Sequence, residues 1–224
     1  MWAATAVLGA LRERDRTGRG VHVTTALFDT ALAWTAFQMT NYLASGEVPQ
    51  LQGSGTPMIA PYEAFPARDG WVMIGAASDA LFVKVCEALG LGALPCDPRF
   101  ASNPQRVANR AALLETMAAV TRTLGASELL GRLQSAGVPS APILTLDRVA
   151  AEPQTEASGM LIPHKHPRVP DYRAVGLPIR WDGERPGVAR VPPLLGEHTS
   201  EVLAELGYDE RTIKELAARH VIQL

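Results

Sequence analysis

Residues 51–76 have the sequence LQGSGTPMIAPYEAFPARDGWVMIGA, in which a glycine-containing loop precedes a predicted β-hairpin. The dipeptide Asp69-Gly70 stands between the apolar runs AF and WVMIG. Asp-Gly between two apolar runs is a strong short-range hairpin signal, since both residues accept the positive φ angles of a tight turn. We therefore predict a two-stranded hairpin over residues 63–75.

The loop before the hairpin, Gly53-Ser54-Gly55, does not fit either of the common phosphate-binding motifs. Met58 stands where the dinucleotide pattern G-x-G-x-x-G requires its third glycine, and Pro57 and Pro61 prevent a helix from starting directly after the loop. No Gly-Lys-Ser/Thr sequence follows. A mobile loop and a plain turn remain, and the residues by themselves favour the turn, because loop glycines usually only supply a positive φ.

Helical patterns surround the hairpin. Ser78 can cap a helix that ends at Gly90, and Asn103-Pro104 supplies an N-cap and first-turn proline for a longer helix that reaches Leu124. Further helices are expected over residues 1–14, 25–45, 128–136, 199–206 and 209–218, and short strands in APILTL, SGMLIP and AVGLPIRW after Pro139. Residues 25–136 thus form one helical lobe with a hairpin.

Composition narrows the class of protein. The chain has 224 residues, 47% of them hydrophobic, with a formal net charge of −2 and a pI near 6.2. Neither a nucleic acid nor an anionic membrane is indicated as a partner. Two cysteines, Cys86 and Cys96, make no disulfide framework, and no apolar run approaches the roughly 20 residues that cross a bilayer. These features favour a cytoplasmic globular protein.

Single residues offer weak catalytic candidates. His164 and His166 alternate as strand metal ligands would, but nothing completes a ligand set, so a solvated hairpin is favoured over a metal site. His198 should precede a helix in a capping or packing role. Asp29 stands in an apolar helix, where a place in the first turn is favoured over a perturbed acid. The residues alone identify no active site.

The first helix is apolar on most of its surface and begins at Met1 without a capping residue. Such a helix needs partners on several sides. The pattern is that of a larger domain whose earlier part lies before this sequence.

An ordered series of motifs resembles family III CoA-transferases, the carnitine-dehydratase-like CaiB/BaiF group. The blocks are ALRERDRTGRGVHVTTALFDTAL, GTPMIAPYEAFPARDGWVMIGA, DPRFASNPQRVANR, LQSAGVPSAPI and PPLLGEHTSEVLAELGYDERTIKEL. Five such blocks in the family's order, along nearly all 224 residues, are a specific match.

The resemblance implies an α/β fold. Family members have a Rossmann-like large domain and a small α+β domain, and two chains interlock as a homodimer. Residues 1–24 then correspond to the end of the first part of the large domain, 25–136 to the small domain with its linker helix and glycine loop, and 137–224 to the segment that returns to the large domain. This chain would cover mainly the small domain and the return segment.

The resemblance also implies a mechanism. In the family an aspartate attacks an acyl-CoA thioester, forms a mixed anhydride and then carries CoA as a thioester until a second acid displaces it. That aspartate lies upstream of the block that begins this chain, so no catalytic residue transfers, and the isolated chain should be inactive. Gly53, Ser54 and Gly55 resemble the mobile loop that shields the intermediate from water. The implied substrates are acyl-CoA and carboxylic acids, including dicarboxylates of the succinate and glutarate type, with no permanently bound cofactor and no metal.

Two other functions stay open. One is a non-catalytic protein, either a partner subunit of a separately encoded half or a degenerate interaction module. The other is a truncated acyl-CoA racemase of the same superfamily, in which an acidic residue tends to follow the second hairpin strand. Ser78 stands at about that place here, which favours a transferase.

Overall fold

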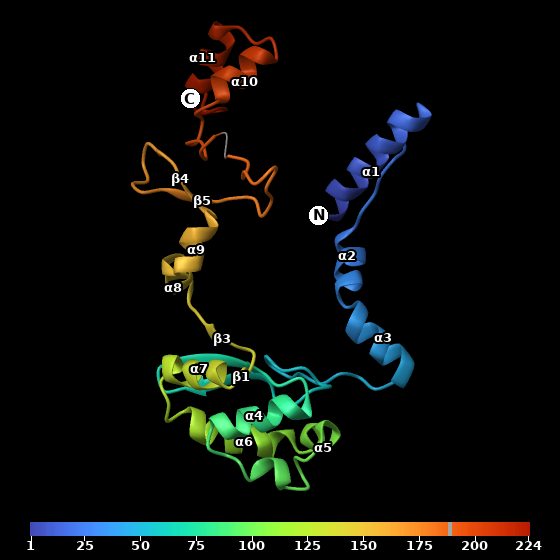
Figure 1. Cartoon of the computed structure of the whole chain (residues 1–224). Helices are drawn as coiled ribbons and strands as arrows, with labels where there is room; N and C mark the ends of the chain where they lie inside the picture. Colours follow the sequence, from blue (N-terminus) through green and yellow to red (C-terminus); the bar gives the residue numbers. More distant parts are fainter. Residues whose placement is uncertain (188–189) are drawn as a thin grey trace. The chain divides into compact units, whose positions relative to one another are not determined.

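The structure is a computed structural model that describes residues 1–187 and 190–224. It forms two compact units, residues 1–143 and residues 144–224 (Figure 1). The first unit contains the hairpin, the glycine loop and a hydrophobic core, and the second contains short helices and a small two-stranded sheet.

The predicted hairpin is present as β1 (Tyr62–Ala67) and β2 (Gly70–Gly75), antiparallel and joined at Arg68-Asp69. A third strand, β3 (Ser140–Ile143), pairs antiparallel with β2 to give the order β1-β2-β3. The predicted hairpin is therefore confirmed, and the strand predicted in APILTL is β3, but a hairpin pattern contains no information about pairing with so distant a strand.

Helices α4 (Asp79–Ala88), α6 (Arg110–Thr121) and α7 (Ala126–Ser135) surround this core. Helix α6 contacts β1, and α7 contacts β2 and β3. Inward-facing residues of the two hairpin strands alternate, with Phe65 opposite Val72 in the register. The fully buried aliphatic and aromatic core includes Phe65, Val72, Ile74, Phe82, Val85, Phe100, Leu113, Met117, Leu129 and Leu133.

Two helix starts show how the sequence sets these elements. The Ser78 hydroxyl accepts a hydrogen bond of 3.2 Å from the Leu81 amide, which confirms the predicted cap of α4. Helix α7 begins after Gly125, which has no side chain to cap it. Instead the Asp69 carboxylate, from the hairpin turn, accepts a 2.7 Å hydrogen bond from the Ala126 amide. The turn therefore fixes the hairpin and the helix together.

The long helix predicted from Asn103 is two helices, α5 (Asn103–Ala108) and α6, with a break at Asn109. Ser102, and not Asn103, is the N-cap residue of α5. The Asn103 side chain was expected to cap its own helix; it instead bonds to the segment that follows the glycine loop. Tertiary hydrogen bonds thus take priority over the local cap.

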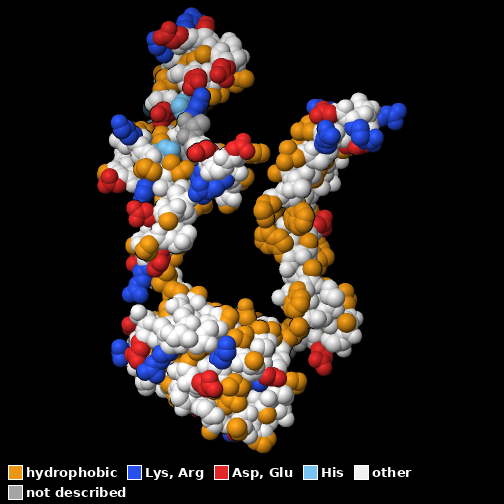
Figure 2. Space-filling view, viewed as in Figure 1, with side chains coloured by type: hydrophobic (Ala, Val, Ile, Leu, Met, Phe, Trp, Pro, Cys, Tyr) orange, Lys and Arg blue, Asp and Glu red, His pale blue; other side chains and the backbone are white. Residues whose placement is uncertain are grey.

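The apolar N-terminal region forms α1 (Trp2–Thr17), α2 (Leu27–Trp34) and α3 (Ala36–Ser45). The single helix predicted over residues 25–45 is broken at Thr35, whose hydroxyl donates to the Leu32 carbonyl at 2.8 Å. No residue of these three helices is buried. Figure 2 shows hydrophobic side chains over much of their surface, and the exposed fractions of Leu27 and Trp34 are 91% and 71%.

The second unit contains α8 (Leu146–Ala151), α9 (Pro153–Ser158), the hairpin of β4 (Leu161–Pro163) and β5 (Arg173–Val175), α10 (Thr199–Glu205) and α11 (Glu210–Ala218). The last two helices and β4 were predicted, β5 coincides with only Ala174 and Val175 of the predicted strand AVGLPIRW, and α8 and α9 were not predicted. Asp209 caps α11 by accepting a 2.7 Å bond from the Thr212 amide. In the described residues, no helix has both the length and the apolarity needed to cross a membrane.

Candidate active-site loop

The glycine loop makes a tight turn before the hairpin. Gly53 has a φ of +61°, a conformation that L side chains rarely adopt, and the Gly55 amide donates to the Gln52 carbonyl at 3.0 Å. The Ser54 hydroxyl accepts a 3.0 Å bond from the Ala64 amide in β1. The turn predicted from the residues is therefore present, and the assignment of Gly53, Ser54 and Gly55 to an active-site lid stays a prediction.

A buried ion pair lies beneath this loop. The Arg110 guanidinium, from α6, binds the Glu63 carboxylate at 2.8 Å, and their side chains are only 15% and 9% exposed. Arg110 also donates to the carbonyls of Thr56 and Ile59, at 2.5 and 2.9 Å. Burial raises the pKa of Glu63 above its usual range, although the charge of Arg110 and its hydrogen bond oppose the rise.

Two more side chains from α5 bind the same segment. The Asn103 amide donates to the Met58 carbonyl at 2.8 Å and accepts from the Ala60 amide at 3.2 Å. Arg106, which is fully buried, donates to the Ala60 carbonyl at 2.7 Å. It also bonds to the Phe100 carbonyl and to Asp79, and its guanidinium lies 4.4 Å from the centre of the Phe82 ring.

Of these side chains, only Asn103 was given a role from the sequence, as a helix cap, and Glu63, Arg106 and Arg110 were given none. Glu63 shares the inward face of β1 with Phe65, two residues on, and an acid at a core position is a signal that it has a buried partner. Asn103, Arg106 and Arg110 are spaced three and four residues apart, which would place them on one face of the continuous helix predicted from the sequence. The spacing of these three residues can be read from the sequence, but their hydrogen-bond partners lie in other segments of the chain.

The two glycines of the loop have different surroundings in the structure, which the sequence did not show. A Cβ on Gly55 would lie 3.2 Å from Arg110 Nη1, from Glu63 Oε2 and from the Gln52 carbonyl oxygen. Gly53, in contrast, has no atom within 4 Å of its hypothetical Cβ. The first glycine satisfies a backbone conformation, and the second allows the chain to approach the ion pair.

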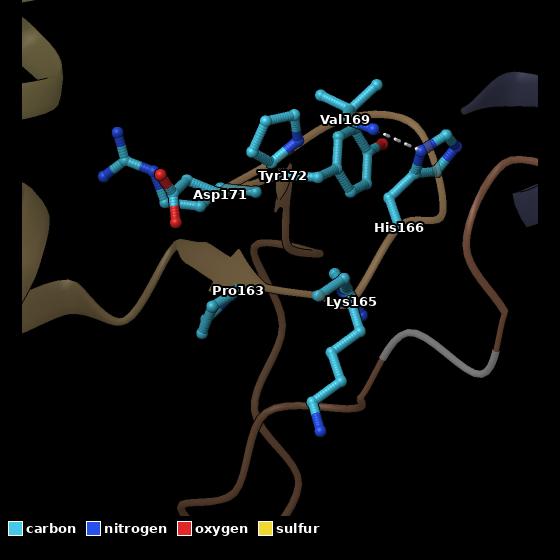
Figure 3. Close-up of a pocket in the computed structure, with 9 residues that line it drawn as sticks. Pro163, Lys165, His166, Val169, Asp171 and Tyr172 are labelled. Carbon is cyan, nitrogen blue, oxygen red and sulfur yellow. Dashed lines mark hydrogen bonds between the residues drawn. The ribbon is translucent and has the colours of Figure 1, made fainter.

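The candidate histidines are not brought into a convergent site. His164 and His166 line an open pocket of the β4–β5 hairpin with Tyr172, while Lys165 extends away from His166 and Tyr172 (Figure 3). His166 Nδ1 accepts hydrogen bonds from the amides of Arg168 and Val169, so this ring nitrogen is already bonded within its own loop. Among residues 1–187 and 190–224, no group of histidines, cysteines and carboxylates could hold a metal ion.

The other single candidates have local roles. Asp29 lies in the first turn of α2, as the favoured interpretation predicted, and is exposed. His198 is the residue before α10, also as predicted, and its Nδ1 lies 3.3 Å from a Glu201 carboxylate oxygen. Neither residue joins the glycine loop in a catalytic group.

The first unit is thus a three-stranded antiparallel sheet with covering helices, and its glycine loop lies on a buried ion pair. A model of CoA-transferase family III matches residues 1–199, and the chain belongs to that family. The family resemblance is thereby confirmed.

Known proteins similar to this chain have CoA-transferase activities. A succinate–glutarate CoA-transferase of Agrobacterium fabrum is 34% identical over 95% of the chain, and the human succinyl-CoA:glutarate CoA-transferase is 31% identical over 99%. The crystal structure of a CaiB/BaiF family protein from Brucella suis superposes with a TM-score of 0.75 at 38% identity over 92% of the chain.

The chain spans about half the length of these relatives: 53% of the Agrobacterium protein, 51% of the human protein and 53% of the Brucella chain. The family and its α/β fold are therefore shown for the matched part. The activity of the whole protein is proposed below.

Proposed function

We propose that this chain is the C-terminal portion of an acyl-CoA:carboxylate CoA-transferase. It would supply the small domain (residues 25–136), the end of the first part of the large domain (1–24) and the return segment (137–224). The observation that carries the proposal is the match to the family along residues 1–199, together with relatives that move CoA between carboxylic acids.

In this proposal the nucleophilic aspartate lies upstream of residue 1 and attacks the thioester carbonyl, so that the C–S bond breaks, CoA leaves as the thiolate and a mixed anhydride forms. Water would hydrolyse that anhydride and waste the acyl group, so the intermediate must be covered. Gly53, Ser54 and Gly55 would provide the cover. Their position at the surface, with the Gly53 backbone exposed, suits a segment that closes over a ligand.

The substrates proposed are an acyl-CoA and a dicarboxylic acid of the succinate and glutarate type. The names of two relatives support this choice. The assembly proposed is an interlocked homodimer that contains the upstream half, and the cell compartment proposed is the cytoplasm. CoA is a substrate here and not a resident group.

The experiment is co-expression of the chain with the coding region upstream of Met1, followed by incubation with succinyl-CoA and intact-mass spectrometry. A covalent acyl or CoA adduct on an upstream aspartate supports the proposal. The isolated chain is the control and should form no adduct. Absence of an adduct in the co-expressed protein, with loss of stereochemistry in a 2-methylacyl-CoA, would instead identify a racemase.

A further inference from the structure

The strongest unexplained feature is the set of side chains that binds the residues just after the glycine loop. Asn103 and Arg106 belong to α5, and Arg110 is the first residue of α6. Together they bond to the carbonyls of Thr56, Met58, Ile59 and Ala60, at 2.5 to 2.9 Å, and to the Ala60 amide. Nearly every backbone carbonyl of the loop's exit thus has a side-chain partner from a helix.

A plain turn does not need charged partners of this kind. A buried ion pair often contributes little net stability, because taking two charges out of water offsets their attraction. The Glu63–Arg110 pair is buried and has further hydrogen bonds to Thr56 and Ile59, so its geometry specifies one position of that segment. Such a pair is better suited to fixing a position than to adding stability.

The two ends of the loop differ in how firmly they are held. On the exit side, residues 56–60 are bound by the three helix side chains, and Gly55 approaches the ion pair too closely for a side chain. On the entry side, Leu51 is fully exposed, and nothing lies near the Gly53 Cβ position. The Ser54 hydroxyl also accepts a hydrogen bond from the Ala64 amide, so the residues before Ser54 are the less restrained end of the loop.

We propose that Arg110, with Glu63, Asn103 and Arg106, is a positioning device that anchors the exit of the glycine loop. The anchor returns the loop to one closed position over the acyl intermediate. These residues are positioning residues, because they contact the loop backbone and not the reacting atoms. The inference rests on the proposed function, since it assigns the loop the task of excluding water.

The first measurement is hydrogen exchange on the 224-residue chain. Arg110→Lys keeps the charge but replaces the two guanidinium nitrogens that bind Glu63 and the Thr56 and Ile59 carbonyls by a single ammonium nitrogen, and Arg110→Met removes the charge. Loss of charged hydrogen bonds should raise exchange of amides 53–59 about tenfold or more, while β2 and α6 amides stay protected. Arg132→Met is the matched control, because Arg132 forms an exposed pair with Glu128.

The second measurement uses the chain co-expressed with its upstream region and compares acyl-CoA hydrolysis with CoA transfer. Arg110→Lys should raise the ratio of hydrolysis to transfer, which a purely structural role would leave unchanged. Gly55→Ala, which places a Cβ against the ion pair, should act in the same direction, and Gly92→Ala, with nothing within 4 Å, should not.

The outcomes are distinguishable. Unchanged loop exchange in both Arg110 variants overturns the anchor. Raised hydrogen exchange in the loop with an unchanged ratio of hydrolysis to transfer shows that the Arg110 contacts hold the loop. It overturns the link between these contacts and the exclusion of water. Absence of CoA transfer in the unsubstituted co-expressed protein refutes the proposed function, and the exchange data still decide the anchor. If Arg110→Met does not fold, Arg110→Lys and Gly55→Ala decide the result.

Discussion

At the scale of single residues, the most informative finding is the acid on the inward face of β1. Glu63 lies between apolar neighbours in the core and finds its partner, Arg110, on a helix that is distant in sequence. Sequence periodicity could have placed Glu63 inside, but only the packing of α6 against β1 shows what it meets. The same holds for Arg106, whose partners come from three segments.

The raised pKa of Glu63 predicts a pH dependence of stability. A carboxyl with a higher pKa in the folded chain contributes stability that is complete below its unfolded pKa, and this stability is lost as the pH rises through the folded pKa. Between about pH 4 and pH 7, the unfolding free energy of the unsubstituted chain should therefore fall relative to that of Glu63→Gln. Urea unfolding at both pH values measures this. An unfolding free energy that rises with pH relative to that of Glu63→Gln would contradict the raised pKa of Glu63.

The two cysteines should differ in reactivity. Burial raises the pKa of the Cys86 thiol to about 12, so it stays protonated and shielded, whereas Cys96 is exposed. Iodoacetamide at about pH 8 should label only Cys96 in the folded chain and both thiols in urea. Peptide mass spectrometry identifies the site. Labelling of Cys86 at the rate of Cys96 in native buffer would show that the core opens readily.

At the scale of elements, the sequence correctly predicted features whose causes are local. The hairpin, whose turn lies at Arg68-Asp69, and the Ser78 cap depend on residues a few positions apart. The sequence patterns did not show which distant segments pair. Strand β3 joins the hairpin from far along the chain, and Asn103 leaves its cap position to bind the loop exit. The breaks at Thr35 and Asn109 interrupt helical patterns that are continuous in sequence.

The hairpin turn also caps α7, which yields a test at this scale. Asp69→Ala removes the acceptor for the Ala126 amide and should lower the unfolding free energy by about 1 kcal/mol. Asp69→Asn, which keeps an acceptor oxygen and suits the turn, should cost less. Ser135→Ala, at an exposed position of α7, is the control. Urea denaturation followed by circular dichroism measures all three, and equal stability of Asp69→Ala and the control would exclude the capping role.

At the scale of the whole molecule, the exposed apolar helices need an explanation that the core does not provide. Helices α1, α2 and α3 have no buried residue, and exposed apolar area of this extent marks a surface for contact with another protein surface. Apolar composition made this predictable from sequence, since the helix at Met1 requires partners on several sides. Sequence patterns could not show which surface covers it.

The exposed apolar surface of α1–α3 leads to a prediction about how the isolated chain behaves in solution. It should self-associate and bind a hydrophobic dye strongly, and co-expression with the upstream region should reduce both effects. Light scattering and dye fluorescence measure the difference. A monodisperse isolated chain with little dye binding would contradict the expectation that another surface covers α1–α3.

Transfer of CoA from succinyl-CoA to glutarate tests the proposed function most directly. The assay measures glutaryl-CoA formed by the isolated chain and by the chain co-expressed with its upstream region. The proposal predicts product from the co-expressed protein and none from the isolated chain, because it assigns the attacking aspartate to a region that precedes residue 1. Transfer by the isolated 224-residue chain, or its absence in both samples with a range of carboxylic acids, would contradict the proposal.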